Sequence, residues 1–149
     1  MAISEFAKEF HEKMFPGYDS KLAKTDPEFI ELFDNFAFDE VVHQTNLDHK
    51  IRFIAILSTL LGSQSIDEFK AMLIAAYHFE VTPIEMKEIV YQGAAYLGIG
   101  RVFPFLHAVN QFCEDNGISL PLEGQSTTNP DNRLEKGRQA LIDIIGEHM

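Results

Sequence analysis

The sequence has few residues that form covalent or metal cross-links. Among its 149 residues only Cys113 is a cysteine, which excludes an intramolecular disulfide, a Cys-x-x-Cys redox pair and a cysteine-rich zinc site. The six histidines include neither a His-x-x-x-His nor a His-Glu-x-x-His pair, and no phosphate loop or dinucleotide fingerprint is present. A chain of this length buries a core without cross-links. We therefore expect one domain, in a reducing compartment, with no metal and no cofactor.

Positive charge and long apolar runs are also scarce. Twenty-three acidic residues against twelve Lys and Arg give a formal net charge of −11, which repels nucleic acid and anionic membrane surfaces. The longest apolar run, near Ile51 to Leu61, is too short to span a bilayer. The first residues lack a basic start followed by an apolar block. We expect a cytoplasmic protein that binds neither nucleic acid nor membrane.

Helix start and stop signals are frequent. Helix starts are indicated at Thr25, Ser65 and Thr82, each followed three positions later by Glu, the capping-box pattern. Gly62, Gly98 and Gly117 stand where helix stops are expected. The sequence predicts an all-α fold, with its most buried helix at Leu47–Leu61. The predicted helices are Ile3–Met14, Pro27–Phe36, a short turn at Asp39–His43, Leu47–Leu61, Ile66–Phe79, Pro83–Leu97, Arg101–Asn116 and Asn132–Ile145.

Glu68 has two interpretations. As the third residue after Ser65, it completes a capping box, which explains it without chemistry. Alternatively, a Glu in the first turn of a helix that faces a pocket with little water has a raised pKa and transfers protons. Met72, four residues later, adds soft apolar lining to the same face. Ser65 and Met72 are therefore candidate pocket residues beside Glu68.

Gln92 and Tyr96 are four residues apart and share one helix face. Among apolar neighbours we expect the Gln92 amide to be buried and hydrogen-bonded. Its partner is either the protein itself, as for a core polar group, or a ligand. His107 lies between apolar residues, and a structural role competes with pocket lining. For Cys113 we expect a small buried residue rather than a nucleophile.

Four segments, taken in order and spacing, carry a resemblance to a known family. Asp26 to Phe36, the helix start Leu47 to Arg52, Val81 to Glu88, and Gln92 to Gly98 resemble the carboxymuconolactone decarboxylase and alkylhydroperoxidase D-like family. The resemblance runs from about Asp26 to Cys113 and is closest to members with tandem or fused domains. It implies an alkylhydroperoxidase D-like helical bundle that forms homo-oligomers, trimers or hexamers, with pockets at or near subunit contacts.

The same resemblance bears on activity. The alkylhydroperoxidase branch uses Cys-x-x-Cys-x-x-x-His, where this chain has Ser65, Glu68 and Met72. Peroxidase activity is therefore disfavoured and stays a second alternative, because serine forms no thiolate. The decarboxylase branch resembles this chain at Glu68 and Gly98 but has His where Met72 and Gln92 stand.

Two functions follow from these residues. In the first, the protein is a lyase or isomerase that acts on a small carboxylated lactone or related metabolite. Glu68 moves the proton, and Gln92 and Tyr96 assist it. In the second, the chain is a non-catalytic small-molecule-binding or assembly module. Arg52 and Arg101 are candidates for binding a substrate carboxylate, or else solvated cations at helix ends. Convergence of Glu68, Gln92 and Tyr96 would favour the enzyme; separation would favour the binding module.

The chain divides into three predicted segments. Residues 1–25 form an N-terminal helix and connection, residues 26–117 the family core, and residues 118–149 a linker and a C-terminal helix. That helix resembles the opening helix of a family domain, as if a second copy began and were not completed. Its apolar residues need a partner, and the linker could extend roughly 45 Å. We expect the arm to pack on another protomer; the alternative is that it folds back on its own domain.

Overall fold

A computed structural model describes residues 2–146 of the chain, and every element within them is helical or irregular. This confirms the predicted all-α class. The elements are α1 Glu5–Met14, α2 Leu22–Thr25, α3 Pro27–Asn35, the π-helical turn η1 Phe36–Glu40, α4 Val41–His43, α5 His49–Gly62, α6 Ile66–His78, α7 Pro83–Leu97, α8 Ile99–Asp115 and α9 Arg133–Ile145.

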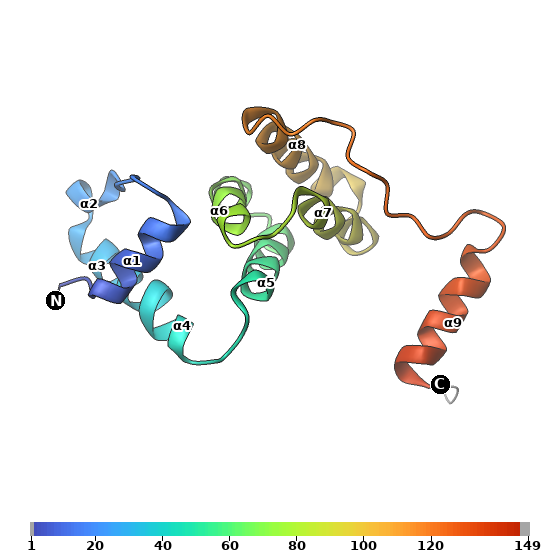
Figure 1. The fold of residues 1–149 in the computed structure, drawn as a ribbon, viewed down its shortest axis with the longest axis horizontal. Coiled ribbons are helices and arrows are strands. Elements are labelled where there is room, and N and C mark those ends of the chain that lie inside the picture. The colour runs from blue at the N-terminus through green and yellow to red at the C-terminus, as the bar shows by residue number, and fades with distance from the viewer. Residues whose placement is uncertain (1, 147–149) are drawn as a thin grey trace.

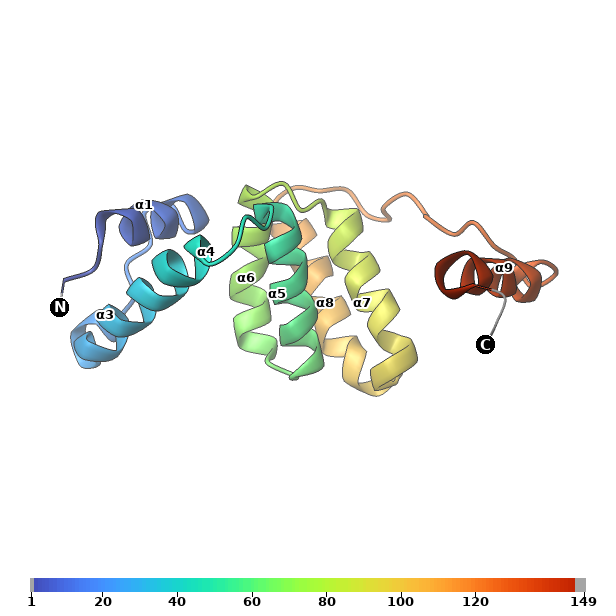
Figure 2. The ribbon, with the colours of Figure 1, turned by 90° about the horizontal axis from the view of Figure 1, so that it is seen from below.

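Helices α5 to α8 form a bundle, and the N-terminal helices lie beside its α6 edge (Figures 1 and 2). Apolar side chains from all four bundle helices are buried between them, including Phe53, Leu73, Val90 and Phe105. α1 contributes Ala7, Phe10 and Met14 to the same core cluster through its apolar face. The contact between α1 and α6 fixes the N-terminal helices against the bundle, and a cavity described below lies beside this contact.

The helix ends follow the predicted signals in part. Thr82 and Glu85 form the expected capping box: Glu85 N–H donates to Thr82 Oγ1 over 3.2 Å, and Thr82 N–H donates to Glu85 Oε2 over 2.8 Å. Gly98 and Gly117 have positive φ, as predicted. The prediction that the helix stops before Gly62 is wrong. Gly62 is the last helical residue, and Gln64 takes the left-handed conformation with φ 61°.

Two other predictions need correction. The segment after α3 is not interrupted, because the π-helical turn η1 carries the chain from Phe36 directly into α4. α5 is also less buried than predicted: Phe53 and Leu57 are in the core, but Ile51 is 50% exposed. α5 packs mainly on α6 and α7, and part of its remaining face, which includes Ile51, is open to solvent.

α9 stands apart from the bundle at the end of an extended linker (Figures 1 and 2). None of its residues is buried, and Leu134 is 85% exposed. The alternative in which α9 folds back on its own domain is therefore not the arrangement seen. Packing on another protomer stays a prediction.

Within residues 2–146 there is no helix with the length and apolar character needed to cross a membrane.

Candidate functional site

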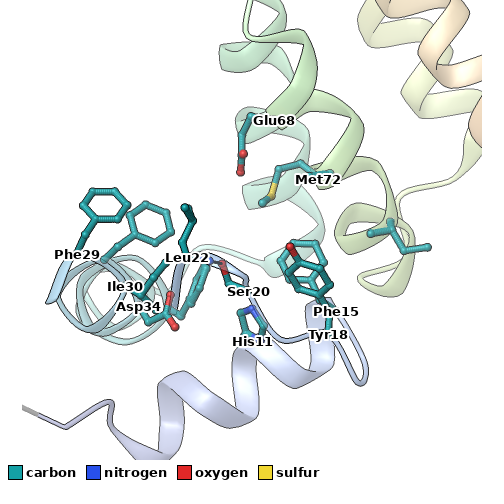
Figure 3. Close-up of a pocket in the computed structure, with 14 residues that line it drawn as sticks. His11, Phe15, Tyr18, Ser20, Leu22, Phe29, Ile30, Asp34, Glu68 and Met72 are labelled. Carbon is teal, nitrogen blue, oxygen red and sulfur yellow. Dashed lines mark hydrogen bonds between the residues drawn. The ribbon is translucent and has the colours of Figure 1, made fainter. Parts of the chain in front are cut away.

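A cavity of about 670 Å³ lies where α1, α3 and η1 face α6. We call it the aromatic cavity, because phenylalanine, tyrosine and other apolar side chains make up most of its wall (Figure 3). Small-molecule sites in proteins have this size and apolar character. The lining residues are His11, Phe15, Tyr18, Ser20, Leu22, Phe29, Ile30, Phe33, Asp34, Phe38, Glu68, Ala71, Met72 and Ile74.

The carboxyl and imidazole groups of this cavity come from three helices. His11 is on α1, Asp34 on α3 and Glu68 on α6. Glu68 and Met72 extend from α6 on one side, and His11 and Asp34 lie on the other (Figure 3). Each has a second lining residue four positions away on its own helix, because residues at that spacing share a face. The cavity therefore combines two carboxyl groups and one imidazole in apolar surroundings.

Asp34 is the acid whose proton affinity the cavity changes. Burial raises the pKa of its carboxyl above the ordinary 3.8, and the charge of His11 opposes this shift. The His11 ring lies among aromatic rings, with centroids 5.4 Å from Phe15 and 5.6 Å from Phe38. A carboxyl group with a raised pKa beside an imidazole is an arrangement suited to proton transfer.

Glu68 does not take part in the predicted capping box. Ser65 makes no side-chain cap bond, and its hydroxyl instead pairs with that of Ser63 at 2.9 Å. The capping prediction is therefore wrong at this helix. Its physical cause is the tight turn before α6, which holds Ser65 at ψ 71°, whereas Thr82, which does cap, has ψ 155°. Within residues 2–146 the Glu68 carboxylate has no hydrogen bond or ion pair, and it borders the aromatic cavity.

Gln92 and Tyr96 line a different and smaller cavity, of about 260 Å³, between α5 and α7. The structure does not bring them together with Glu68 in one chain. The prediction that Gln92 is buried is wrong: Gln92 is exposed, and Tyr96 is 88% exposed. α7 instead buries Met86 and Val90.

A sequence comparison then decides the family. The model of the carboxymuconolactone decarboxylase family matches residues 27–111, which is more than half of the chain. The chain belongs to the carboxymuconolactone decarboxylase family. It is also 26% identical over 92 residues to a 4-carboxymuconolactone decarboxylase of Acinetobacter baylyi, a match that covers 62% of this chain and 69% of that protein.

Of the other site residues predicted from the sequence, only Met72 lines one of the two cavities. Arg52 donates to the carbonyl oxygens of Val41 and Val42 over 3.3 and 3.2 Å, so its guanidinium secures α4. Arg101 and His107 are exposed on α8, and neither they nor Ser65 line either cavity. In the part of the chain that the structure describes, no cluster of His, Cys, Asp or Glu is arranged to hold a metal ion.

Sequence reasoning did not identify His11 and Asp34. Each is a single polar residue on a helix far from Glu68 in the sequence, and no local spacing links the three. The only signal was periodic: His11 precedes Phe15 by four residues and Asp34 follows Ile30 by four, so each shares a face with an apolar residue. That pattern is common on amphipathic helices, and it acquires meaning only once α1, α3 and α6 are placed together.

The burial of Asp34 predicts a pH-dependent effect on stability. Because its folded pKa is raised, the ionised carboxyl opposes folding, and stability falls as pH rises through that pKa. Asp34→Asn should therefore raise the urea midpoint at pH 8, and the gain should shrink towards pH 4, close to the ordinary value of 3.8. Asp131→Asn, at an exposed linker position, is the control. An Asp34→Asn variant less stable than the parent at pH 8 contradicts the prediction.

Proposed function

We propose that this protein is an acid–base enzyme of the lyase or isomerase type, which acts on a small carboxylated metabolite in the aromatic cavity. The observation that carries the proposal is the meeting of Glu68, Asp34 and His11 in one apolar cavity, with a raised pKa at Asp34. Family membership and the relative named 4-carboxymuconolactone decarboxylase support a carboxylated lactone as the substrate.

The two carboxyl groups take different roles in the proposed reaction. Asp34, which holds its proton to higher pH than an ordinary aspartate, is the general acid, and Glu68 is the general base. In a decarboxylation, the bond between the ring carbon and the carboxylate breaks and carbon dioxide leaves. The electron pair of the broken bond stays on the substrate. The substrate carbon then takes a proton from the acid. In an isomerisation, Glu68 removes a proton from one carbon and Asp34 supplies one to another.

The charges of the cavity suit a reaction that removes a carboxylate. Among the described residues 2–146, no lysine or arginine lines the aromatic cavity, and His11 is the one lining residue able to carry a positive charge. A substrate carboxylate placed against this apolar wall loses water and lies near acidic groups, so its ground state is raised in energy. Loss of carbon dioxide relieves that charge. For the same reason, we expect a lactone that carries a carboxylate to bind more weakly as the pH rises and Asp34 ionises.

The proposal is tested with the purified full chain and 4-carboxymuconolactone. We expect release of carbon dioxide that saturates with substrate concentration. A saturated γ-lactone bearing one carboxylate, here called the lactone acid, lacks the unsaturated system that accepts the electron pair and serves as a stable binding probe. Calorimetry should show that it binds, with an affinity that falls as the pH rises above the ordinary aspartate value of 3.8 and Asp34 ionises. The proposed substrate class is contradicted if the protein does not turn over 4-carboxymuconolactone and does not bind the lactone acid.

The second candidate function is a non-catalytic binding module for the same class of metabolite. The separation of Gln92 and Tyr96 from Glu68 favours it, because the acid–base group then lacks the two polar neighbours that sequence analysis assigned to it. The two functions give different results in the same experiments. Saturable binding of the lactone acid without turnover of its unsaturated analogue supports the binding module.

Peroxide reduction is the function that the single thiol makes least favourable. Cys113 is fully buried, burial raises the pKa of its thiol, and no second cysteine exists to resolve an oxidised intermediate. We predict that the chain and its Cys113→Ser variant reduce alkyl hydroperoxides equally slowly with dithiol donors. A peroxidase rate that depends on Cys113 in a coupled assay contradicts this prediction.

A further inference from the structure

α3 presents an unusual row of apolar side chains to solvent. Phe29, Leu32, Phe33 and Phe36, the α3 stripe, follow the three- and four-residue spacing of a single helix face. They are between 42% and 59% exposed. Phe29 and Phe33 also line the aromatic cavity, whereas Leu32 and Phe36 do not. Four large apolar side chains in one row form a contiguous exposed patch of the kind that marks an interaction site.

α9 carries a second row of the same kind. Leu134, Leu141, Ile144 and Ile145, the α9 stripe, are between 48% and 85% exposed. Gly137 lies within this face, and with no side chain it allows a close approach by another helix. A helix of this length is marginal in water without a packing partner. Both stripes therefore lack the apolar contact that their composition requires.

We propose that the α9 stripe of one copy docks on the α3 stripe of a second copy, with the two helices parallel. The spacing of the anchors matches: Phe29 and Phe36 are seven residues apart, and so are Leu134 and Leu141. In parallel register, Leu134 lies beside Phe29 and Leu141 beside Phe36.

The charges beside the two stripes support the same register. Asp26 and Glu28 are exposed at the start of α3, and Arg133 is exposed at the start of α9. Parallel docking brings Arg133 close to Asp26 and Glu28, so that opposite charges meet at the two helix starts. Complementary charge at the edge of an interface favours one register over another.

The path of the linker favours a second copy over the same chain. α3 and α9 lie at opposite ends of the molecule (Figures 1 and 2). Ile118 and Leu120 pack against the core, so the free linker begins only after them and has a maximum reach of roughly 40 Å. To meet its own α3, α9 would have to return around the bundle. Docking in trans needs no such path, and it covers the Phe29 and Phe33 wall of the aromatic cavity with a second copy.

Sedimentation of the full chain tests the interface. We expect self-association at micromolar concentration, with a dissociation constant at least about tenfold weaker in Leu141→Asp, on the α9 stripe, and in Phe36→Asp, on the α3 stripe. The matched controls are Gln139→Asp, on the polar side of α9, and Phe103→Asp, at an exposed residue of α8. A chain that stays monomeric, or stripe variants that assemble like the controls, would overturn the proposal.

Cysteine cross-linking tests the register without disturbing the interface. Chains with Phe36→Cys and chains with Leu141→Cys are mixed and oxidised, with the buried Cys113 left in place. We expect a disulfide-linked dimer in this mixture, and little in a mixture of Phe103→Cys with Leu141→Cys. When both substitutions are placed in one chain, a product that remains monomeric on a denaturing gel shows docking in cis and overturns the proposal. Preferential linkage of Leu141→Cys to Phe29→Cys overturns the parallel register.

Discussion

Glu68→Gln is expected to lower kcat for the proposed isomerisation, in which Glu68 is the general base, by about 10²- to 10⁴-fold, the usual contribution of a positioned acid–base group. The variant removes the carboxylate that accepts a proton and keeps the shape of the side chain. Glu68 has no capping role in the structure, because Ser65 makes no cap bond. Folding should therefore be unchanged, and the loss should fall on kcat more than on KM. Steady-state kinetics with circular dichroism as a check on folding measures both.

Ser65→Ala is the matched control for Glu68→Gln. The Ser65 hydroxyl pairs only with that of Ser63, so its removal should change unfolding free energy by about 0.5 kcal/mol or less, as for other surface substitutions. Activity should remain. If Glu68→Gln keeps full activity while Ser65→Ala destabilises the protein by about 1 kcal/mol, the loss expected for a true cap, Glu68 is a structural residue and the proposed mechanism fails.

Phe69→Ala is expected to lower the free energy of unfolding by about 3–5 kcal/mol, the range for large-to-small substitutions of buried aromatic residues. Phe69 is 0% exposed, and its ring packs edge-on against Phe105 with centroids 4.9 Å apart. This contact joins α6 to α8 at the residue that follows Glu68. Urea unfolding followed by circular dichroism measures the loss.

Phe103→Ala provides the comparison for Phe69→Ala on the same bundle. Phe103 is 48% exposed on α8, so the substitution creates no enclosed cavity, and we expect a loss of about 1 kcal/mol or less. Equal losses for the two variants would show that α6 and α8 are not joined through a packed aromatic core.

The elements predicted correctly from sequence are those whose determinants are local. α7 begins at Pro83 and ends at Leu97, as predicted, because Thr82, Glu85 and Gly98 set both ends with groups a few residues away. The errors arise where more distant structure decides. Ser65 looks like the same cap as Thr82, but the preceding turn, with Gln64 at φ 61°, sets its backbone. The π-helical turn η1 has no sequence signal of its own.

The candidate site was predictable only in part for the same reason. Glu68 and Met72 could be placed together because four residues separate them on one helix. His11 and Asp34 reach the cavity through the packing of α1 and α3 against α6, which no local pattern encodes. Gln92 was expected to be buried because of its apolar neighbours, but Tyr91 and Tyr96 are themselves 49% and 88% exposed. A run of apolar residues on α7 thus did not indicate burial.

The central claim is that ligands bind in the aromatic cavity, between Glu68 on one side and His11 and Asp34 on the other. A crystal structure of the full chain with the lactone acid bound tests it most directly. We expect ligand density in the cavity, with a polar atom of the probe within hydrogen-bond distance of Asp34 or Glu68. Density in the α5–α7 cavity beside Gln92 and Tyr96, with the aromatic cavity empty of probe, would contradict it.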